Sequence, residues 1–143
     1  MVRITQLDLI IVRWLKRYGL QILRFSLGIV FIWFGLLKIF SQSPANQLIT
    51  KTIYWFDPNW FIPLLGGWEI LIGLCFLHRK LLRLGIFLMM LQMLGTFLPL
   101  LILPGIVYTK NIFYLTLEGQ YIIKNLVLIA AALVIGSHVR EKR

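Results

Sequence analysis

Four long apolar segments constrain this chain more than any other feature of its sequence. They occupy residues 20–40, 61–78, 84–103 and 119–136. Each approaches or reaches the ~20 residues that a helix needs to cross ~30 Å of hydrocarbon. With 59% hydrophobic and only 14% charged residues, the chain is too apolar for a soluble domain of 143 residues. We therefore predict an all-α integral membrane protein, an antiparallel four-transmembrane-helix bundle.

Basic residues between the apolar segments predict the orientation of the bundle. Those on one side are Arg3, Arg13, Lys16, Arg17, Arg79, Lys80, Arg83, Arg140, Lys142 and Arg143, against Lys51 and Lys110 on the other. By the positive-inside rule both termini are cytoplasmic, in a bacterial-type inner membrane or an internal membrane derived from it. The net charge of +10 then favours lipid headgroups rather than nucleic acid as the anionic partner.

The ends of the chain are expected to lie outside the 20–137 transmembrane domain. In residues 1–19 an apolar series at helical spacing faces a basic one, which predicts an interfacial amphipathic helix. The apolar series is Ile4, Leu7, Ile11, Trp14 and Tyr18. A flexible basic leader is the alternative, and a cleaved signal peptide is a further one, although no A-x-A site follows. Residues 138–143 form a short basic tail.

The connections between the spans differ in length and composition. The inner one, "HRKLLR", is so short that the second and third spans must form an antiparallel hairpin. The first outer connection ends in "IYWFDPNW", whose aromatic residues are typical of a belt at headgroup depth. An entrance for a lipid or a quinone is the alternative interpretation. The second outer connection, "PGIVYTKNIFYLTLE", is also aromatic and apolar.

Polar residues inside the spans are the candidates for a functional site, since charge in hydrocarbon is costly. With each span centred on the membrane, a rise of 1.5 Å per residue places Glu69 and Gln92 near the midplane. Arg24 then lies about 9 Å toward the cytoplasm and Lys124 about 6 Å toward the outside, with Lys38 and Glu118 near the outer edge. Tyr121 and Asn125, in the last span, complete the candidates.

The lean of helical side chains toward the helix N-terminus suggests how these residues pair. Glu69 and Lys124 both lean outward, so Lys124 is the predicted salt-bridge partner of Glu69, and Gln92 a hydrogen-bond partner. Arg24 leans away and is expected to reach the inner headgroups. Lys38 and Glu118 are expected to meet near the outer surface.

Small residues and one proline predict where the helices approach each other. Gly28 and Gly35 share a face with Lys38, while Gly66 and Gly73 flank Glu69, and small residues allow close packing of membrane helices. A second contact is expected at Ala132 and Gly136. The polar residues Gln92 and Thr96 precede Pro99 at helical spacing, which predicts a stripe ending at a kink.

Two interpretations of the polar interior stay open at this stage. Glu69, Gln92 and Lys124 form either a network that fixes helix register or a site for a proton, an ion or a polar ligand head. We find no catalytic motif and no predicted metal ligands, and His78 and His138 are more typical of span ends. Cys75 is the only cysteine, which excludes an internal disulfide or dithiol.

The motifs "RFSLGIVFIWFGLLKIF", "GGWEILIGLCFL", "LLRLGIFLMMLQMLGTFLPLLILP" and "LEGQYIIKNLVLIAAALVIG" resemble the successive motifs of the DoxX-like superfamily of small four-span membrane proteins. The resemblance covers Arg24 to Ser137. It transfers no catalytic role, but it implies that the following polar and small positions are shared: Arg24, Gly28, Gly35, Lys38, Glu69, Gly73, Glu118, Gly119, Gln120, Lys124 and Asn125. The superfamily includes subunits of quinone-linked oxidoreductases and assembly chaperones.

From these observations we expect a non-catalytic small subunit or adaptor of a membrane complex, in which electron transfer is one option. One alternative is a quinone-interacting subunit of a thiosulfate:quinone-type oxidoreductase, and quinone is the only cofactor considered. Others are an assembly chaperone or scaffold and a proton-coupled transporter. The expected partners are the bilayer and another membrane or membrane-associated protein, and a homo-oligomer is compatible with the sequence.

Overall fold

The computed structural model describes residues 2–139, and within that range the chain is helical apart from turns, loops and one isolated β-bridge, Tyr108 to Leu115. Four stretches are long and apolar enough to cross a membrane: Thr5–Ile39, Pro58–Leu77, Arg79–Ile102 and Leu117–Ser137. The prediction of an all-α chain with four membrane-length helices is confirmed. The cytoplasmic position of the termini stays a prediction, and residues 140–143 of the basic tail lie outside the described residues.

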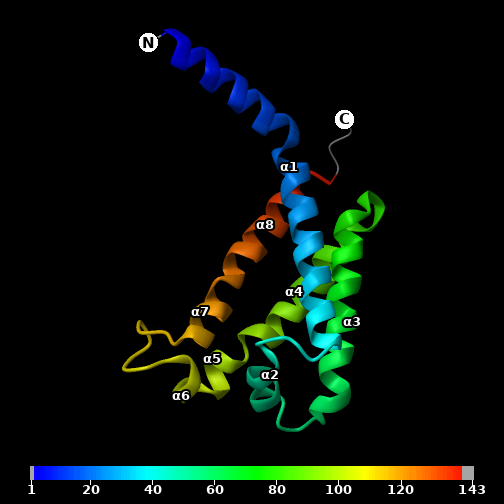
Figure 1. Cartoon of the computed structure of the whole chain (residues 1–143), viewed down its shortest axis with the longest axis vertical. Helices are drawn as coiled ribbons and strands as arrows, with labels where there is room; N and C mark the ends of the chain where they lie inside the picture. The colour runs from blue at the N-terminus through cyan, green and yellow to red at the C-terminus, as the bar shows by residue number, and fades with distance from the viewer. Residues whose placement is uncertain (1, 140–143) are drawn as a thin grey trace.

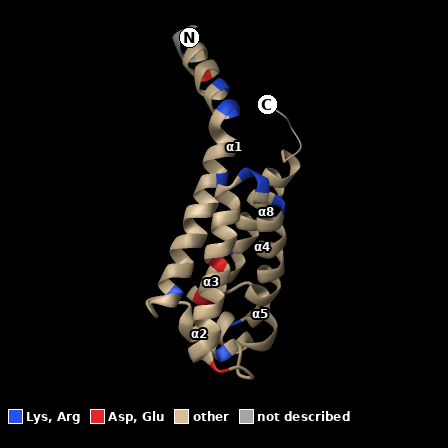
Figure 2. Cartoon of the chain, turned by 90° about the vertical axis from the view of Figure 1, so that its right-hand side faces the viewer, with Lys and Arg blue, Asp and Glu red and all other residues tan. Residues whose placement is uncertain are grey.

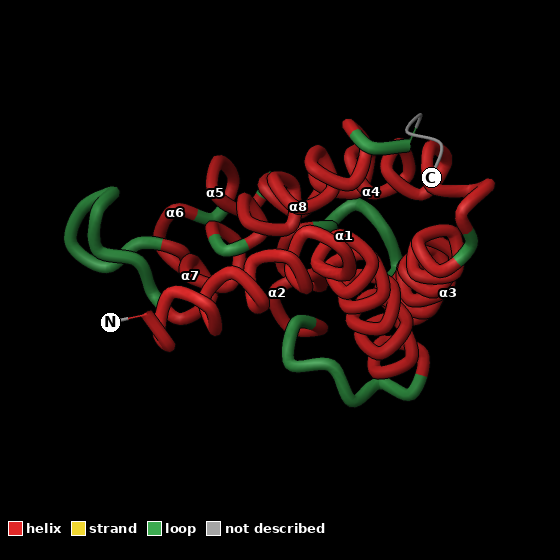
Figure 3. The backbone as a smooth tube through the Cα atoms, turned by 90° about the horizontal axis from the view of Figure 1, so that it is seen from above, coloured by secondary structure: helices red, strands yellow, loops and turns green. Residues whose placement is uncertain are grey.

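The four stretches form a bundle in which chain neighbours run in opposite directions (Figure 1). Helix α1 (Val2–Ile39) packs on α3 (Pro58–Leu77), and α3 also packs on α4 (Leu82–Phe97). The short η1 turn (Arg79–Leu81) connects α3 to α4. Helix α8 (Asn125–Ser137), preceded by α7 (Leu117–Ile123), contacts both α1 and α4 and so closes the bundle (Figure 3).

The first helix is longer than predicted. Residues 2–19 and the first span, which we expected as separate segments, form the single helix α1. No proline or capping residue separates the two parts in the sequence, and Gly19, with open space around it, does not interrupt the helix. A helix of 38 residues is about 57 Å long, far more than a bilayer core requires. The N-terminal part therefore projects beyond the bundle, and its axis changes direction there (Figure 1).

The projecting part of α1 leaves an apolar face uncovered. Leu7, Ile11 and Trp14 each expose more than half of their surface along one side of the helix, and Leu9, Ile10 and Leu15 are exposed to a similar extent around it. Such a face is stable against lipid acyl chains and unstable in water. The prediction that this segment lies at the membrane surface is unchanged by its continuity with the first span.

A spin-label experiment tests where the projecting part lies. In a Cys75→Ala background, a label at Ile11→Cys should be relaxed mainly by oxygen, which concentrates in lipid. A label at Arg13→Cys, on the opposite face, should be relaxed mainly by a water-soluble nickel chelate. Equal exposure of both labels to the nickel chelate in liposomes would show that this segment stands in water.

Helices α1 and α3 approach so closely that backbone touches backbone. A Cβ atom built on Gly66 would lie 2.6 Å from the carbonyl oxygen of Gly35, and one on Gly73 would lie 2.5 Å from that of Gly28. In the reciprocal contacts, a Cβ on Gly28 would lie 3.0 Å from the Gly73 carbonyl oxygen, and one on Gly35 would be closer still to that of Gly66. Only glycine fits such positions, so the predicted small-residue contacts between these helices are confirmed. They also fix the register, with Gly28 level with Gly73 and Gly35 level with Gly66.

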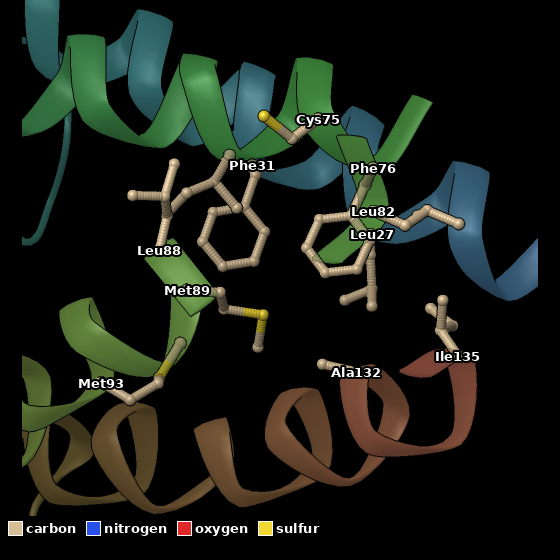
Figure 4. Packing of buried hydrophobic residues seen from close by; sticks show 11 residues of the cluster. Leu27, Phe31, Cys75, Phe76, Leu82, Leu88, Met89, Met93, Ala132 and Ile135 are labelled. Atoms are coloured by element: carbon tan, nitrogen blue, oxygen red, sulfur yellow. The ribbon is translucent and has the colours of Figure 1, made fainter. Parts of the chain in front are cut away.

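The apolar core lies in the half of the bundle nearest the inner hairpin (Figure 4). Its best-buried members are Ile72 and Phe76 from α3, Met89 from α4, and Ala132 and Ile135 from α8. A Cβ on Gly136 would lie 3.2 Å from Ile86 Cδ1, so the predicted small residues of α8 do pack against α4. Apolar side chains from all the spans thus form the core, which extends from the inner hairpin to the middle of the bundle, where Glu69 and Gln92 lie.

Two helix breaks accompany the outer half. The third span is interrupted between α4 and α5 (Pro99–Ile102), where the Leu98 N–H bonds Gly95 O at 3.2 Å because Pro99 cannot continue the ladder. The kink predicted at Pro99 falls at this interruption. The fourth span is interrupted at Lys124, which we did not predict.

The outer connections contain short helices that the sequence analysis did not identify. Helix α2 (Asn46–Thr52) lies in the first connection and buries Thr52, whereas α6 (Pro104–Val107) lies in the second. No side chain caps the start of α2, so the usual sequence signal for a helix start is missing. Helix α2 lies against α3 and α5 at the outer end of the bundle, whereas α6 lies beside α5 and α7 (Figure 1).

Candidate functional site

Glu69 is held by two side chains from neighbouring helices. Its Oε2 accepts a hydrogen bond from Lys38 Nζ at 2.7 Å, and its Oε1 accepts one from Gln92 Nε2 at 2.7 Å. Lys38 and Glu69 are each only 6% exposed. We call Lys38, Glu69 and Gln92 the buried triad. It joins α1, α3 and α4, so one interaction set connects three of the membrane-length helices.

The prediction that Lys124 pairs with Glu69 is wrong. Lys124 is exposed, and its Nζ lies 4.2 Å from the centre of the Tyr121 ring on the same helical segment. The buried position nearby is Ile122, and two residues correspond to a rotation of about 200° around a helix. Lys124 therefore lies on the outer wall of the bundle, where a cation over an aromatic face is modestly favourable.

The prediction that Lys38 pairs with Glu118 is also wrong. Glu118 is exposed in the first turn of α7, whereas Lys38 lies inside the bundle. From the contact of Gly35 with Gly66, Lys38 is level with Pro63, about 7 Å outside the midpoint of α3 rather than at the membrane edge. The error arose because we centred the first span on residues 20–40, whereas α1 is displaced inward along the bundle.

The geometry also explains how Lys38 reaches Glu69 across six residues of axial distance, about 9 Å. Helices α1 and α3 are antiparallel, so the lean of each side chain toward its own N-terminus brings the two charges toward each other. The same argument, applied to Lys38 as well as to Lys124, makes Lys38 a candidate partner of Glu69 from the sequence.

The prediction that Gln92 bonds Glu69 is confirmed, and the site has unused hydrogen-bonding capacity. Gln92 Oε1 is buried and has no hydrogen-bond partner in the structure. The Lys38 ammonium carries three donors, of which one bonds Glu69. A buried acceptor and a buried cationic donor thus lie on the two sides of one carboxylate.

The hydrogen bonds of the buried triad suit an ion pair. Beside the bond from Lys38, the amide of Gln92 supplies the second hydrogen bond that a desolvated carboxylate needs. A buried ion pair is weak evidence that the fold gains net stability, but removing one partner strongly destabilises the protein. The clearest physical consequence of the buried triad is to fix the register of α1, α3 and α4.

Gln92→Met tests the amide arm of this set. The change keeps the side-chain volume but leaves Glu69 Oε1 without its donor, and we expect a loss of roughly 1–3 kcal/mol in unfolding free energy. Steric-trapping unfolding in bicelles measures the change. Gln120→Met, at an exposed position of α7, is the matched control and should have little effect. Equal effects at the two positions would contradict the assigned role of Gln92.

The remaining candidates lie away from the buried triad. Asn125 Nδ2 donates to the Tyr121 carbonyl oxygen at 3.2 Å, and the Tyr121 ring is largely exposed, so both belong to the outer wall. Arg24 lies at the other end of the bundle, level with Leu77, about 14 Å from the α3 midpoint. Whether any of them contacts a ligand stays a prediction.

Two observations complete the chemistry of the described residues. In residues 2–139 no group of three or more His, Cys, Asp or Glu side chains is placed to hold a metal ion. His138 Nδ1 lies 2.9 Å from both Ser137 Oγ and the Val134 carbonyl oxygen, a local contact at the end of α8.

Comparison with known proteins adds no relative: protein-family models, curated proteins and solved structures all give no match to this chain.

Proposed function

We propose that this chain is a non-catalytic small subunit or adaptor of a membrane complex in a bacterial-type inner membrane, as its DoxX-like motifs suggest. The observation that carries the proposal is the engagement of Glu69. Both oxygens of this central carboxylate are bonded within the bundle, by Lys38 and by Gln92. A carboxylate held in this way serves the assembly of helices better than the transfer of protons or substrate.

The outer end of the bundle supplies surface for a partner. Tyr54 and Phe113 are 77% and 85% exposed, in the first and second outer connections respectively. Trp55, Phe56 and Trp60 continue the first connection in a chain of ring contacts 5.7–6.4 Å between centroids. Aromatic residues are enriched where membrane proteins meet both partners and headgroups.

The test is extraction of the tagged full chain from its native membrane in a gentle detergent, followed by mass spectrometry of the intact assembly. We expect a partner protein in fixed stoichiometry with the chain. Tyr54→Ser with Phe113→Ser should release it, whereas Lys110→Ala, near Phe113 in sequence, should not. Recovery of the chain alone from membranes in which cross-linking also captures no partner would refute the adaptor role.

A second candidate function has its own observation. The unpartnered Gln92 Oε1 can accept a hydrogen bond from a hydroxyl group, and the spare Lys38 donors match a carbonyl or a phenol oxygen. A quinol headgroup offers both, since one hydroxyl donates to Gln92 Oε1 and the oxygen of the other accepts from Lys38, whereas the oxidised quinone can use the Lys38 donors alone. Extraction of the same preparation into organic solvent should then yield a quinone at a fixed ratio to protein. Gln92→Met should deplete it while the protein partner stays bound.

A further inference from the structure

A second polar site lies at the inner end of the bundle, away from the buried triad. Arg24 is half-buried there, level with the end of α3, and its Nε is buried without a hydrogen-bond partner. Basic residues gather around this end of the bundle (Figure 2). Because a buried guanidinium donor needs an acceptor, the unpartnered Nε indicates a missing anionic or carbonyl group.

The surroundings of Arg24 are positive rather than negative. Its guanidinium carbon lies 4.6 Å from the centre of the Phe25 ring, which orients the plane. Arg79, the exposed first residue of η1, follows Leu77 by two residues, and Arg24 is level with Leu77, so the two guanidinium groups gather at the same end of the bundle. Their charges repel each other, and an anion bound beside both offsets that repulsion.

The carboxylates of the described residues are too far away to serve as that anion. Glu69 is bonded in the buried triad, and Asp57 and Glu118 begin α3 and α7 at the outer end. Asp8 precedes Arg24 by sixteen residues of continuous helix, about 24 Å. The remaining acidic residue, Glu141, lies outside the described residues, so its contribution is tested with the variant Glu141→Gln.

We propose that Arg24 and Arg79 together bind the phosphate group of an anionic phospholipid from the inner leaflet. The depth is appropriate, because the end of α3 marks the boundary where acyl chains give way to headgroups. Guanidinium groups match phosphate oxygens with two parallel hydrogen bonds, and Arg24 Nε is one of the donors that such a fork uses. The proposal depends on the membrane position and the predicted orientation of the bundle and not on the adaptor role.

Native mass spectrometry of the delipidated full chain tests the site, with phosphatidylglycerol and phosphatidylcholine added in turn. We expect phosphatidylglycerol to bind the wild-type chain in preference to phosphatidylcholine. Arg24→Gln and Arg79→Gln should each weaken phosphatidylglycerol binding roughly 10-fold or more, the loss typical of a charge-assisted hydrogen bond. Lys110→Gln, which removes one positive charge at the outer side, is the matched control and should change nothing.

Two further variants keep the result interpretable. Arg79 is exposed, so Arg79→Gln should fold even if Arg24→Gln does not, and Arg24→Lys keeps the charge while removing the planar fork. Glu141→Gln should leave lipid binding unchanged. The proposal is overturned if Lys110→Gln weakens binding as much as Arg79→Gln, or if Glu141→Gln strengthens it severalfold. If millimolar inorganic phosphate displaced the lipid, the site would be one for free phosphate, and the proposal of a phospholipid ligand would be overturned.

Discussion

Lys38→Met is expected to destabilise the bundle by about 3–5 kcal/mol, since it leaves Glu69 as a buried charge without its cation. Glu69→Leu should have a similar effect, because the Lys38 ammonium then stays buried without its carboxylate. Both substituted residues are almost fully buried, so water cannot replace the lost partner. Unfolding by steric trapping in bicelles, or by detergent titration in mixed micelles, gives the free energies.

Matched controls exist for both changes in the same chain. Lys124→Met and Glu118→Gln remove the same kinds of charge from exposed positions in the fourth span, and each should change stability by less than about 0.5 kcal/mol. If Lys124→Met were as harmful as Lys38→Met, the assignment of the ion pair would be wrong.

The second large effect is expected at the glycine contacts between α1 and α3. Gly66→Ala places a methyl group against the Gly35 carbonyl oxygen, at a distance that requires the two helices to separate. Overpacking of this kind costs about 1–3 kcal/mol for a methyl group, and Gly66→Leu should prevent the two helices from docking. Separation of the helices also lengthens the bond from Lys38 to Glu69, so the two effects reinforce each other.

The adjacent residue, Gly67, provides the control. It lies in the same helix with no atom within 4 Å of a built Cβ, so Gly67→Ala should be neutral or slightly stabilising. Comparing the two alanine variants by thermal unfolding in detergent removes helix propensity from the difference. Equal melting temperatures would show that α1 and α3 do not meet at Gly66.

Much of this architecture is readable from the sequence because lipid imposes simple rules. Apolar length identified the four spans, and glycine spacing identified a close-packing face on each of the first two, although not that these faces meet. Pro99 marked a helix break because it lacks the N–H that the ladder requires. Gln92 was found as a partner of Glu69 because both lie midway along a hairpin whose short turn fixes the register.

The ion pair itself was not predicted correctly, and the reason is specific. Centring the first span on its apolar stretch placed Lys38 near the surface, but the glycine contacts place it about 7 Å from the midpoint of α3. Apolar length gives the depth of a helix poorly when its N-terminal extension is also apolar. The register of two packed helices, set by Gly35 on Gly66, gives that depth better.

Lys124 was misplaced for a different reason. The helical wheel of the fourth span does not show which face packs inward, because apolar residues surround it almost completely. The break at Lys124 and the burial of Ile122 settle the face, and both depend on tertiary packing against the rest of the bundle. The short helix α2 was missed because it begins without a capping side chain.

A double-mutant cycle between Lys38 and Glu69 tests the central claim most directly. Unfolding free energies are measured for Lys38→Met, Glu69→Leu and the double variant, and in parallel for Lys124→Met with Glu69→Leu. We predict that the Lys38 double variant loses less stability than the two single variants combined, with a coupling of about 2–3 kcal/mol, while the Lys124 cycle is additive. Additivity in the Lys38 cycle, or coupling in the Lys124 cycle instead, would contradict the buried ion pair on which this account of the bundle depends.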